Sequence, residues 1–186
     1  MRAEVERRLV HATGAAFPLA YALDLLPYAA LRLLLSVAVA VAAVLEALRL
    51  SGRVRWAFFD RLTREYERSA PAGYALYLLS MAAVAWLFAP DAAIPAMLML
   101  ALGDPVSGLL STGGLRPAKR GFVLLAMFGV CTLLALPFVG SVPAIAGAAA
   151  ATLADGVKPV VAGYVVDDNL TIPPAAALAI TLATTV

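Results

Sequence analysis

Hydrophobic residues fill long segments of this chain, and polar residues gather in the breaks between them. Three short breaks contain proline or glycine and predict tight reversals, namely "LLPYAA", "FAPDAA" and "VGSVPA". The apolar segments are longer than strands and lack the alternation of a membrane β-barrel, so they predict helices. Seven such segments can be drawn, at residues 10–26, 29–48, 72–89, 92–111, 121–139, 142–163 and 171–186.

The amino-acid composition indicates that these predicted helices are membrane spans. Of the 186 residues, 63% are hydrophobic and 14% are charged, whereas soluble domains have about 45–50% and about 25%. Each crossing of a bilayer takes about 20 residues. The sequence therefore predicts one integral membrane domain, residues 1–186, built as an all-α bundle of about seven transmembrane helices. Cys131, the single cysteine, is expected to be a packing residue.

Positive charge gathers at alternate breaks. Arginines precede the first segment, residues 49–70 carry six arginines after the second, and "RPAKRG" follows the fourth. The positive-inside rule then predicts a cytoplasmic N-terminus in the cell membrane, with Arg32 as the exception. We interpret residues 49–70 as a cytoplasmic basic amphipathic loop that contacts lipid headgroups. The arginines are not interleaved with aromatic residues, which argues against nucleic-acid binding.

The same topology brings four polar stretches to the cytoplasmic face: "LGDPVSG", "LRPAKRG", "LADGVKP" and "VVDDNLTIP". Ionisable residues within apolar segments cost about 2.5–3.5 kcal/mol on insertion scales and are functional hypotheses by default. The spacing of Asp155 and Lys158 predicts one helix face. They form either a neutralising ion pair or a carboxylate for metal beside an ammonium for phosphate.

Asp104, Ser107 and Ser111 also share a predicted helix face, which either packs helices or contributes to a site. Asp167, Asp168 and Asn169 form either an ordinary polar turn or a set of hard oxygen ligands for Mg²⁺. Pro173 and Pro174 suit the first turn of the following helix, with Thr171 as its cap.

His11, at the cytoplasmic end of the first segment, is either an interfacial polar residue or part of a site. Three acidic residues near the ends of segments need no special role, namely Asp24, Glu46 and Asp91.

Taken together, these motifs resemble the dolichol kinase/phytol kinase family of membrane enzymes, as a compact prokaryotic or archaeal member. The resemblance rests on Arg7-Arg8-Leu9-Val10-His11, Gly103-Asp104 with Ser107, and Asp168-Asn169-Leu170-Thr171-Ile172-Pro173 with Asp155 upstream. The family's Lys-Ser/Thr-x-Glu-Gly motif is reduced here to "AKRG", which keeps Lys119, Arg120 and Gly121.

The resemblance implies a lipid-alcohol kinase that transfers the γ-phosphate of CTP, or another nucleoside triphosphate, to a polyprenol or another isoprenoid alcohol. Carboxylates would hold Mg²⁺ or act as base, and cations would contact phosphate. The expected catalytic residues are Asp104, Asp155 and Asp168, which with Asp167 are also the expected metal ligands. The expected nucleotide and phosphate contacts are Ser107, Lys119, Arg120, Lys158, Asn169 and His11.

Three alternatives to this interpretation remain open. The first is a kinase whose acceptor is a diacylglycerol-like lipid. The second is a CTP-dependent cytidylyltransferase that acts on a phospholipid precursor, and the third is a non-catalytic transporter or assembly protein.

Overall fold

The computed structural model describes residues 2–53, 63, 67, 70–111, 119–157, 160–161 and 164–185. Helices make up almost all of this part of the chain, so the predicted all-α class is confirmed. The elements are α1 (Arg2–Thr13), α2 (Ala16–Ala22), α3 (Tyr28–Leu50), α5 (Gly73–Leu87), α6 (Pro90–Leu98), the π-helix η2 (Met99–Gly103), α7 (Asp104–Leu110), α8 (Gly121–Ala135), α9 (Ser141–Gly156), β1 (Val160–Val161), β2 (Tyr164–Val165) and α10 (Asp168–Thr184).

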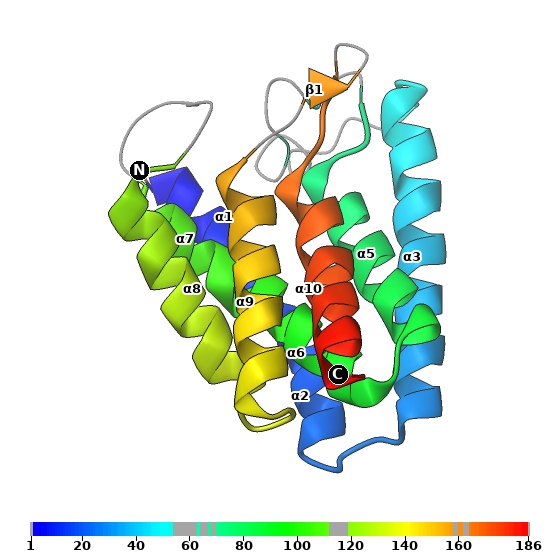
Figure 1. Ribbon diagram of the computed structural model, residues 1–186. Helices are drawn as coiled ribbons and strands as arrows, with labels where there is room; N and C mark the ends of the chain where they lie inside the picture. Colours follow the sequence, from blue (N-terminus) through cyan, green and yellow to red (C-terminus); the bar gives the residue numbers. More distant parts are fainter. Residues whose placement is uncertain are drawn as a thin grey trace.

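The helices form a bundle in which the chain runs back and forth between two ends (Figure 1). The N-terminus, β1 and the first turns of α8 and α10 lie at one end, which we call the N-terminal end. The C-terminus, α2 and the connection between α8 and α9 lie at the other end. Helix ends from distant parts of the sequence therefore meet at the N-terminal end.

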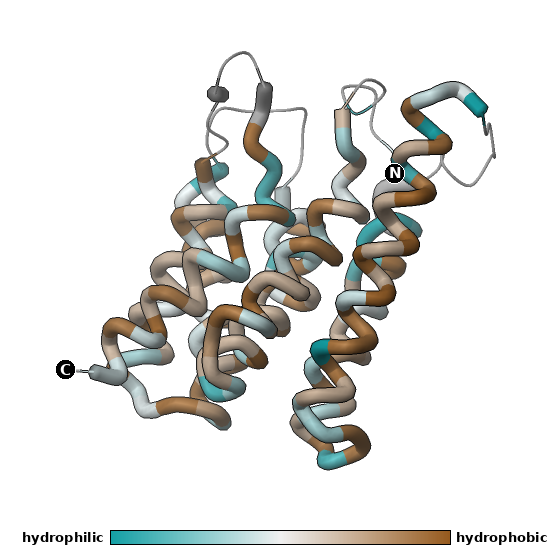
Figure 2. The backbone as a smooth tube through the Cα atoms, turned by 90° about the vertical axis from the view of Figure 1, so that its right-hand side faces the viewer, coloured by the Kyte–Doolittle hydropathy of each residue, from teal (hydrophilic) through white to brown (hydrophobic). Residues whose placement is uncertain are grey.

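A single long helix forms the centre of the bundle. It is built from α6, η2 and α7, and every residue from Ala92 to Ala101 is buried. α5, α8 and α10 all pack against it. Large hydrophobic side chains are exposed on the outer helices, including Leu33, Val37 and Val41 on α3 and Leu125 and Leu133 on α8, and hydrophobic residues run along the helices in Figure 2. Large exposed apolar patches mark surfaces that contact a membrane or another protein.

Two helices of the described chain are long and apolar enough to cross a membrane, Tyr28–Leu50 and Pro90–Leu110. Helix α10 has 17 residues, whereas α5 and α8, with 15 residues each, are shorter than the sequence segments predict. At 1.5 Å per residue such a helix reaches about 22 Å, compared with a hydrocarbon core of about 30 Å.

Several predicted boundaries are wrong. Segment 10–26 is broken into α1 and α2 after Thr13, and segment 142–163 is helical only to Gly156. Beyond that point, Val160 and Val161 pair with Val165 and Tyr164 in an antiparallel ribbon. Most of the predicted loop at 49–70 lies outside the described residues, and α3 extends to Leu50.

Arg32, the exception to the charge rule, is accommodated by the last turn of α5. Its Nε donates a 2.7 Å hydrogen bond to the carbonyl of Ala85. Its guanidinium also lies 4.6 Å from the ring centre of Tyr28 and 5.2 Å from that of Trp86. A cation is favourable here because it meets both aromatic faces and the negative end of a helix dipole.

Glu46, which needed no special role in the sequence, holds α3 to the start of α5. It is buried and accepts hydrogen bonds from Arg49 (2.6 Å), from the Tyr74 hydroxyl (2.5 Å) and from the Ala72 N–H (3.0 Å). Arg49 also donates to the carbonyl of Ala70 at 2.7 Å. This fully engaged carboxylate is structural.

Helix α10 begins three residues before the predicted cap. Asp167 is the N-cap, because its Oδ1 accepts a 3.0 Å hydrogen bond from the Asn169 N–H. The prediction that Thr171 caps the helix and that Pro173 and Pro174 occupy its first turn is therefore wrong. Both prolines lie inside the helix.

These prolines have a structural consequence. Pro173 has no N–H to donate to the carbonyl of Asn169, four residues earlier. That carbonyl instead accepts a 2.6 Å hydrogen bond from the Ser80 hydroxyl of α5. The released backbone group thus ties α10 to α5.

We predict that Ser80→Ala lowers the free energy of unfolding by about 1–3 kcal/mol, because it leaves the buried Asn169 carbonyl without its donor. Pro173→Ala restores an N–H at the right place, so the double variant should recover part of the loss. Unfolding curves of the purified protein in mixed detergent micelles measure both effects. Ser51→Ala is the control, since this exposed hydroxyl donates to the carbonyl of Leu48 in its own helix end. If the effects of Ser80→Ala and Pro173→Ala on the free energy of unfolding simply add, the prediction is contradicted.

Candidate functional site

Three buried carboxylates meet at the N-terminal end of the bundle. Asp104 is the first residue of α7, Asp155 lies in the last turn of α9 and Asp168 is the first residue of α10. One oxygen from each lies within 4.8 Å of the others. We call this group the acidic cluster. The back-and-forth course of the chain creates it, because residues up to 64 positions apart are brought together at one bundle end.

Asp155 is held on both of its oxygens. Oδ1 accepts a 2.5 Å hydrogen bond from the Lys119 ammonium, and Oδ2 accepts one of 2.6 Å from the Ser107 hydroxyl. Lys119 also donates to Ser107 Oγ at 2.9 Å, which closes the triangle. The carboxylate has no solvent exposure. Lys119 and Ser107 therefore fix the orientation of Asp155 and offset its charge.

Asp104 faces a histidine that the π-helix positions. In η2, the Asp104 N–H donates to the carbonyl of Met99, five residues earlier. The same pattern would pair the Leu100 carbonyl with residue 105, but Pro105 has no N–H. His11 Nε2 lies 3.1 Å from that carbonyl and 3.7 Å from Asp104 Oδ2. Because a carbonyl oxygen only accepts hydrogen bonds, Nε2 carries the ring proton and donates a hydrogen bond to the Leu100 carbonyl.

Tyr77 supports the other side of His11. The two rings meet edge to face with centroids 4.5 Å apart, and the Tyr77 hydroxyl donates to the backbone carbonyl of His11 at 3.2 Å. Gly14 permits this contact, since a Cβ there would lie 1.9 Å from the Tyr77 oxygen. Arg8 makes a second link from α1, donating to the carbonyl of Asp104 at 3.4 Å.

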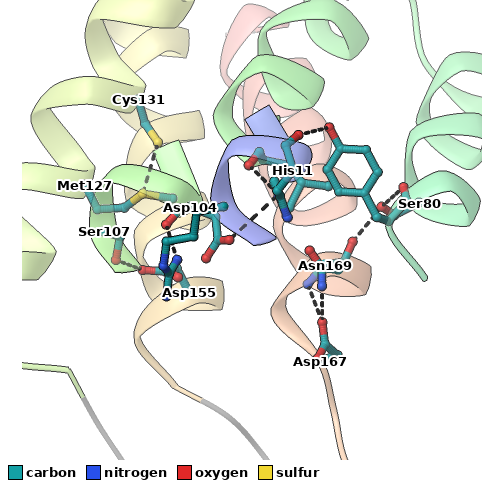
Figure 3. A network of polar contacts seen from close by, with 12 residues as sticks. His11, Ser80, Asp104, Ser107, Met127, Cys131, Asp155, Asp167 and Asn169 are labelled. Carbon is teal, nitrogen blue, oxygen red and sulfur yellow. Dashed lines mark hydrogen bonds and ion pairs between the residues drawn. The ribbon is translucent and has the colours of Figure 1, made fainter. Parts of the chain in front are cut away.

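Asn169 presents an unsatisfied oxygen beside the acidic cluster. Its Nδ2 donates a 2.6 Å hydrogen bond to Asp167 Oδ1, which orients the amide group. Its Oδ1 is buried and has no hydrogen-bond partner among the described residues. Figure 3 shows Ser107 and Asp155 on one side of Asp104, and His11, Ser80 and Asn169 on the other. The site therefore has two chemically different sides.

A divalent cation fits the acidic cluster. When ionised, its three carboxylates carry three negative charges, and Lys119 supplies one positive charge at hydrogen-bond distance. The excess negative charge in a buried place is costly unless it is neutralised. Carboxylate oxygens are hard donors of the kind that Mg²⁺ prefers. Asp104, Asp155 and Asp168 would hold such an ion.

A cavity of about 230 Å³ adjoins the Asn169 side of the site. Its lining residues are Arg7, Arg8, Val10, His11, Thr13, Gly14, Phe17, Glu67, Gly73, Tyr74, Tyr77, Leu78, Asp104 and Asn169. Most of its wall is apolar. Asp104 is the member of the acidic cluster that lines it, so cavity and cluster share one carboxylate.

The structure brings most of the predicted site residues together, namely Asp104, Asp155, Asp168, Ser107, Lys119, Asn169 and His11. Asp167 is not in the acidic cluster; it caps α10 and orients Asn169. Arg120 is the N-cap residue of α8 and its side chain is exposed. Lys158 lies outside the described residues. The cation that the structure places on Asp155 is Lys119, where the sequence suggested Lys158.

Sequence reasoning missed Ser80 and Tyr77 as parts of the site. Both lie in an apolar helix with no motif around them. Pro173 was an available signal for Ser80, because a proline inside a helix releases a carbonyl that needs another donor. Nothing in the sequence indicated that Tyr77 would support His11.

Comparisons with protein-family models, with curated proteins and with solved structures find no match for this chain.

We predict that Mg²⁺ raises the unfolding temperature of the purified protein, because the folded acidic cluster binds the ion and the unfolded chain does not. The gain is about 2.7 kcal/mol at a concentration one hundred times the dissociation constant. A Mg²⁺ titration followed by thermal unfolding measures it.

Asp104→Asn and Asp155→Asn should each remove most of the Mg²⁺-dependent rise. Asp91→Asn is the matched control, since this exposed acid lies in the first turn of α6, away from the cluster. An equal rise in all three variants would show that Mg²⁺ binds elsewhere.

Proposed function

We propose that this chain is an integral membrane phosphotransferase that moves the γ-phosphate of a nucleoside triphosphate, CTP in the first instance, to the hydroxyl of a polyprenol or another isoprenoid alcohol. The observation that carries the proposal is a buried acidic cluster with an ammonium in contact, at one end of a bundle whose outer surface is apolar. Phosphoryl transfer needs these parts, because its catalysis is mainly positioning and neutralisation of charge.

Membrane integration is supported by the two long apolar helices and by the exposed hydrophobic side chains of α3 and α8. The other helices run alongside these two in the same bundle (Figure 1). We infer about seven crossings of the cell membrane, with the N-terminal end facing the cytoplasm. Arginines concentrated in α1 and after α3 agree with this orientation. A nucleotide would then reach the acidic cluster from the cytoplasm, and a lipid would reach it from the bilayer.

The transfer step follows from this arrangement. The alcohol oxygen forms a bond to the γ-phosphorus, the bond from that phosphorus to the bridging oxygen breaks, and the nucleoside diphosphate leaves. The proton of the hydroxyl passes to a carboxylate of the acidic cluster. Mg²⁺, when bound, neutralises charge on the phosphate oxygens.

Asp104 is the carboxylate best placed to receive that proton. Both oxygens of Asp155 are already engaged by Lys119 and Ser107. Asp104, in contrast, lines the cavity next to the cluster.

Lys119 has a further donor for the nucleotide. An ammonium has three N–H groups, and the described contacts of Lys119 Nζ use two of them, on Asp155 and on Ser107. The third can donate to a phosphate oxygen without breaking the triangle.

We predict that the purified protein transfers label from γ-labelled CTP, or from γ-labelled ATP in a parallel reaction, to one of three lipids offered: a polyprenol, geranylgeraniol and a diacylglycerol. Asp155→Asn and Asp168→Asn should each lower the rate about a hundredfold or more, as loss of a charge-stabilising group does in other enzymes. Asp91→Asn should leave the rate unchanged. Thin-layer separation of the labelled lipids measures the product and names the acceptor.

Two outcomes count against the proposal. Label that enters lipid from α-labelled CTP, but not from γ-labelled CTP, identifies a cytidylyltransferase. Folded protein that binds Mg²⁺ but labels no lipid from either nucleotide points to a transporter or an assembly protein.

A further inference from the structure

The cavity lies between helices α1 and α5, beside the contact of His11 with Tyr77. α1 packs against η2 and α7, and the gap on its other side is lined by Val10 and His11 of α1 and by Tyr77 and Leu78 of α5. Val10 is 52% exposed, so this wall continues onto the outer surface of the bundle. The cavity therefore connects the acidic cluster with the apolar exterior.

One buried polar atom on this wall points to a ligand. Asn169 is only 7% exposed, and its Oδ1 has no hydrogen-bond partner among the described residues. Asp167 holds the Nδ2 of the same amide, so the amide cannot turn over without losing a 2.6 Å hydrogen bond. An amide oxygen is only an acceptor. A group that donates a hydrogen bond, such as an alcohol O–H, would satisfy it, and leaving it bare costs free energy.

The size and polarity of the cavity select between the two substrates of the proposed reaction. Sites that enclose a drug-sized ligand have volumes of about 300–1,000 Å³, and this cavity has about 230 Å³ with a mostly apolar wall. It suits the hydroxyl end of a lipid better than a whole nucleotide. Lys119 and Ser107, which suit phosphate, contact Asp155 and are not among the residues that line the cavity.

We propose that this cavity is the acceptor site, and that Asn169 Oδ1 accepts the hydrogen bond of the substrate's hydroxyl while the isoprenoid chain leaves beside Leu78 and Val10. This inference rests on the proposed function and names the half of the site that binds the lipid. Asn169 binds and orients the hydroxyl beside Asp104, which also lines the cavity.

The two roles are compatible in time. The transition state of phosphoryl transfer is loose in most analyses, so the attacking hydroxyl keeps its proton until late in the reaction. Asn169 Oδ1 can accept a hydrogen bond from the hydroxyl in the bound state, and Asp104 can receive the proton as the new bond to phosphorus forms.

The first test compares geranylgeraniol with its methyl ether, which lacks the O–H. Binding of each tritiated lipid to the full-length protein in nanodiscs is measured without nucleotide or Mg²⁺. We expect the alcohol to bind wild type about fivefold to tenfold more tightly than the ether, as one buried hydrogen bond implies. In Asn169→Leu the two lipids should bind equally. Equal binding to wild type overturns the proposal, even if the variant fails to fold.

A second test blocks the cavity. Leu78→Trp fills the wall and should weaken binding of the alcohol at least about tenfold and raise its KM more than it lowers kcat. Leu79→Trp is the matched control, because the neighbouring side chain is 46% exposed and does not line the cavity. Equal effects of the two substitutions overturn the proposal.

Further measurements separate this inference from the proposed function. Mn²⁺ binding followed by electron paramagnetic resonance should survive in Asn169→Leu. Loss of Mn²⁺ binding with unchanged lipid binding would make Oδ1 an ion ligand and overturn the inference. Phosphate transfer with no preference for the alcohol over the ether would uphold the kinase and reject this site. A preference for the alcohol without any phosphate transfer would uphold this binding site and reject the kinase.

Discussion

Repulsion among three buried carboxylates is the interaction on which the arrangement of this protein depends. With one oxygen of each carboxylate within 4.8 Å of the others and an effective dielectric constant of about 20, each ionised pair repels by at least about 3.5 kcal/mol. Lys119 offsets part of this cost at Asp155. Leucines in place of these carboxylates would pack at a lower cost in folding free energy. The three carboxylates could hold a cation at the end of the bundle where the helices meet.

The prolines connect the fold to this site. Pro105 and Pro173 each remove a backbone donor inside a helix, and each released carbonyl is taken by a side chain from another helix. His11 bonds the carbonyl of Leu100 and Ser80 bonds that of Asn169. The first link places His11 3.7 Å from Asp104, and the second ends at Asn169, which directly follows Asp168. Irregular helix geometry therefore positions Asp104 and Asp168, as π-helical turns at functional sites often do.

Much of the fold and part of the site could be predicted from hydrophobic pattern and charge. The helical class follows from the length of the apolar segments, and the alternation of basic breaks already indicated that Asp104, Asp155 and Asp168 would share one face. The partner of Asp155 could not be predicted. Local spacing indicates Lys158, which lies outside the described residues, and the ammonium that the structure places on Asp155 is that of Lys119, 36 residues away. The start of α10 could not be predicted, because the cap signal of Asp167 fits a metal ligand equally well.

The sequence by itself determined which residues had to be explained, because a charge in an apolar segment is costly wherever the segment packs. It also determined where backbone donors are missing, since proline lacks an N–H in any fold. Only the tertiary structure decided what satisfies each of them. Ser80 and Tyr77 acquire their roles from helix packing that no local pattern encodes. The open oxygen of Asn169 likewise appears only when Asp167 fixes its amide at the edge of a cavity.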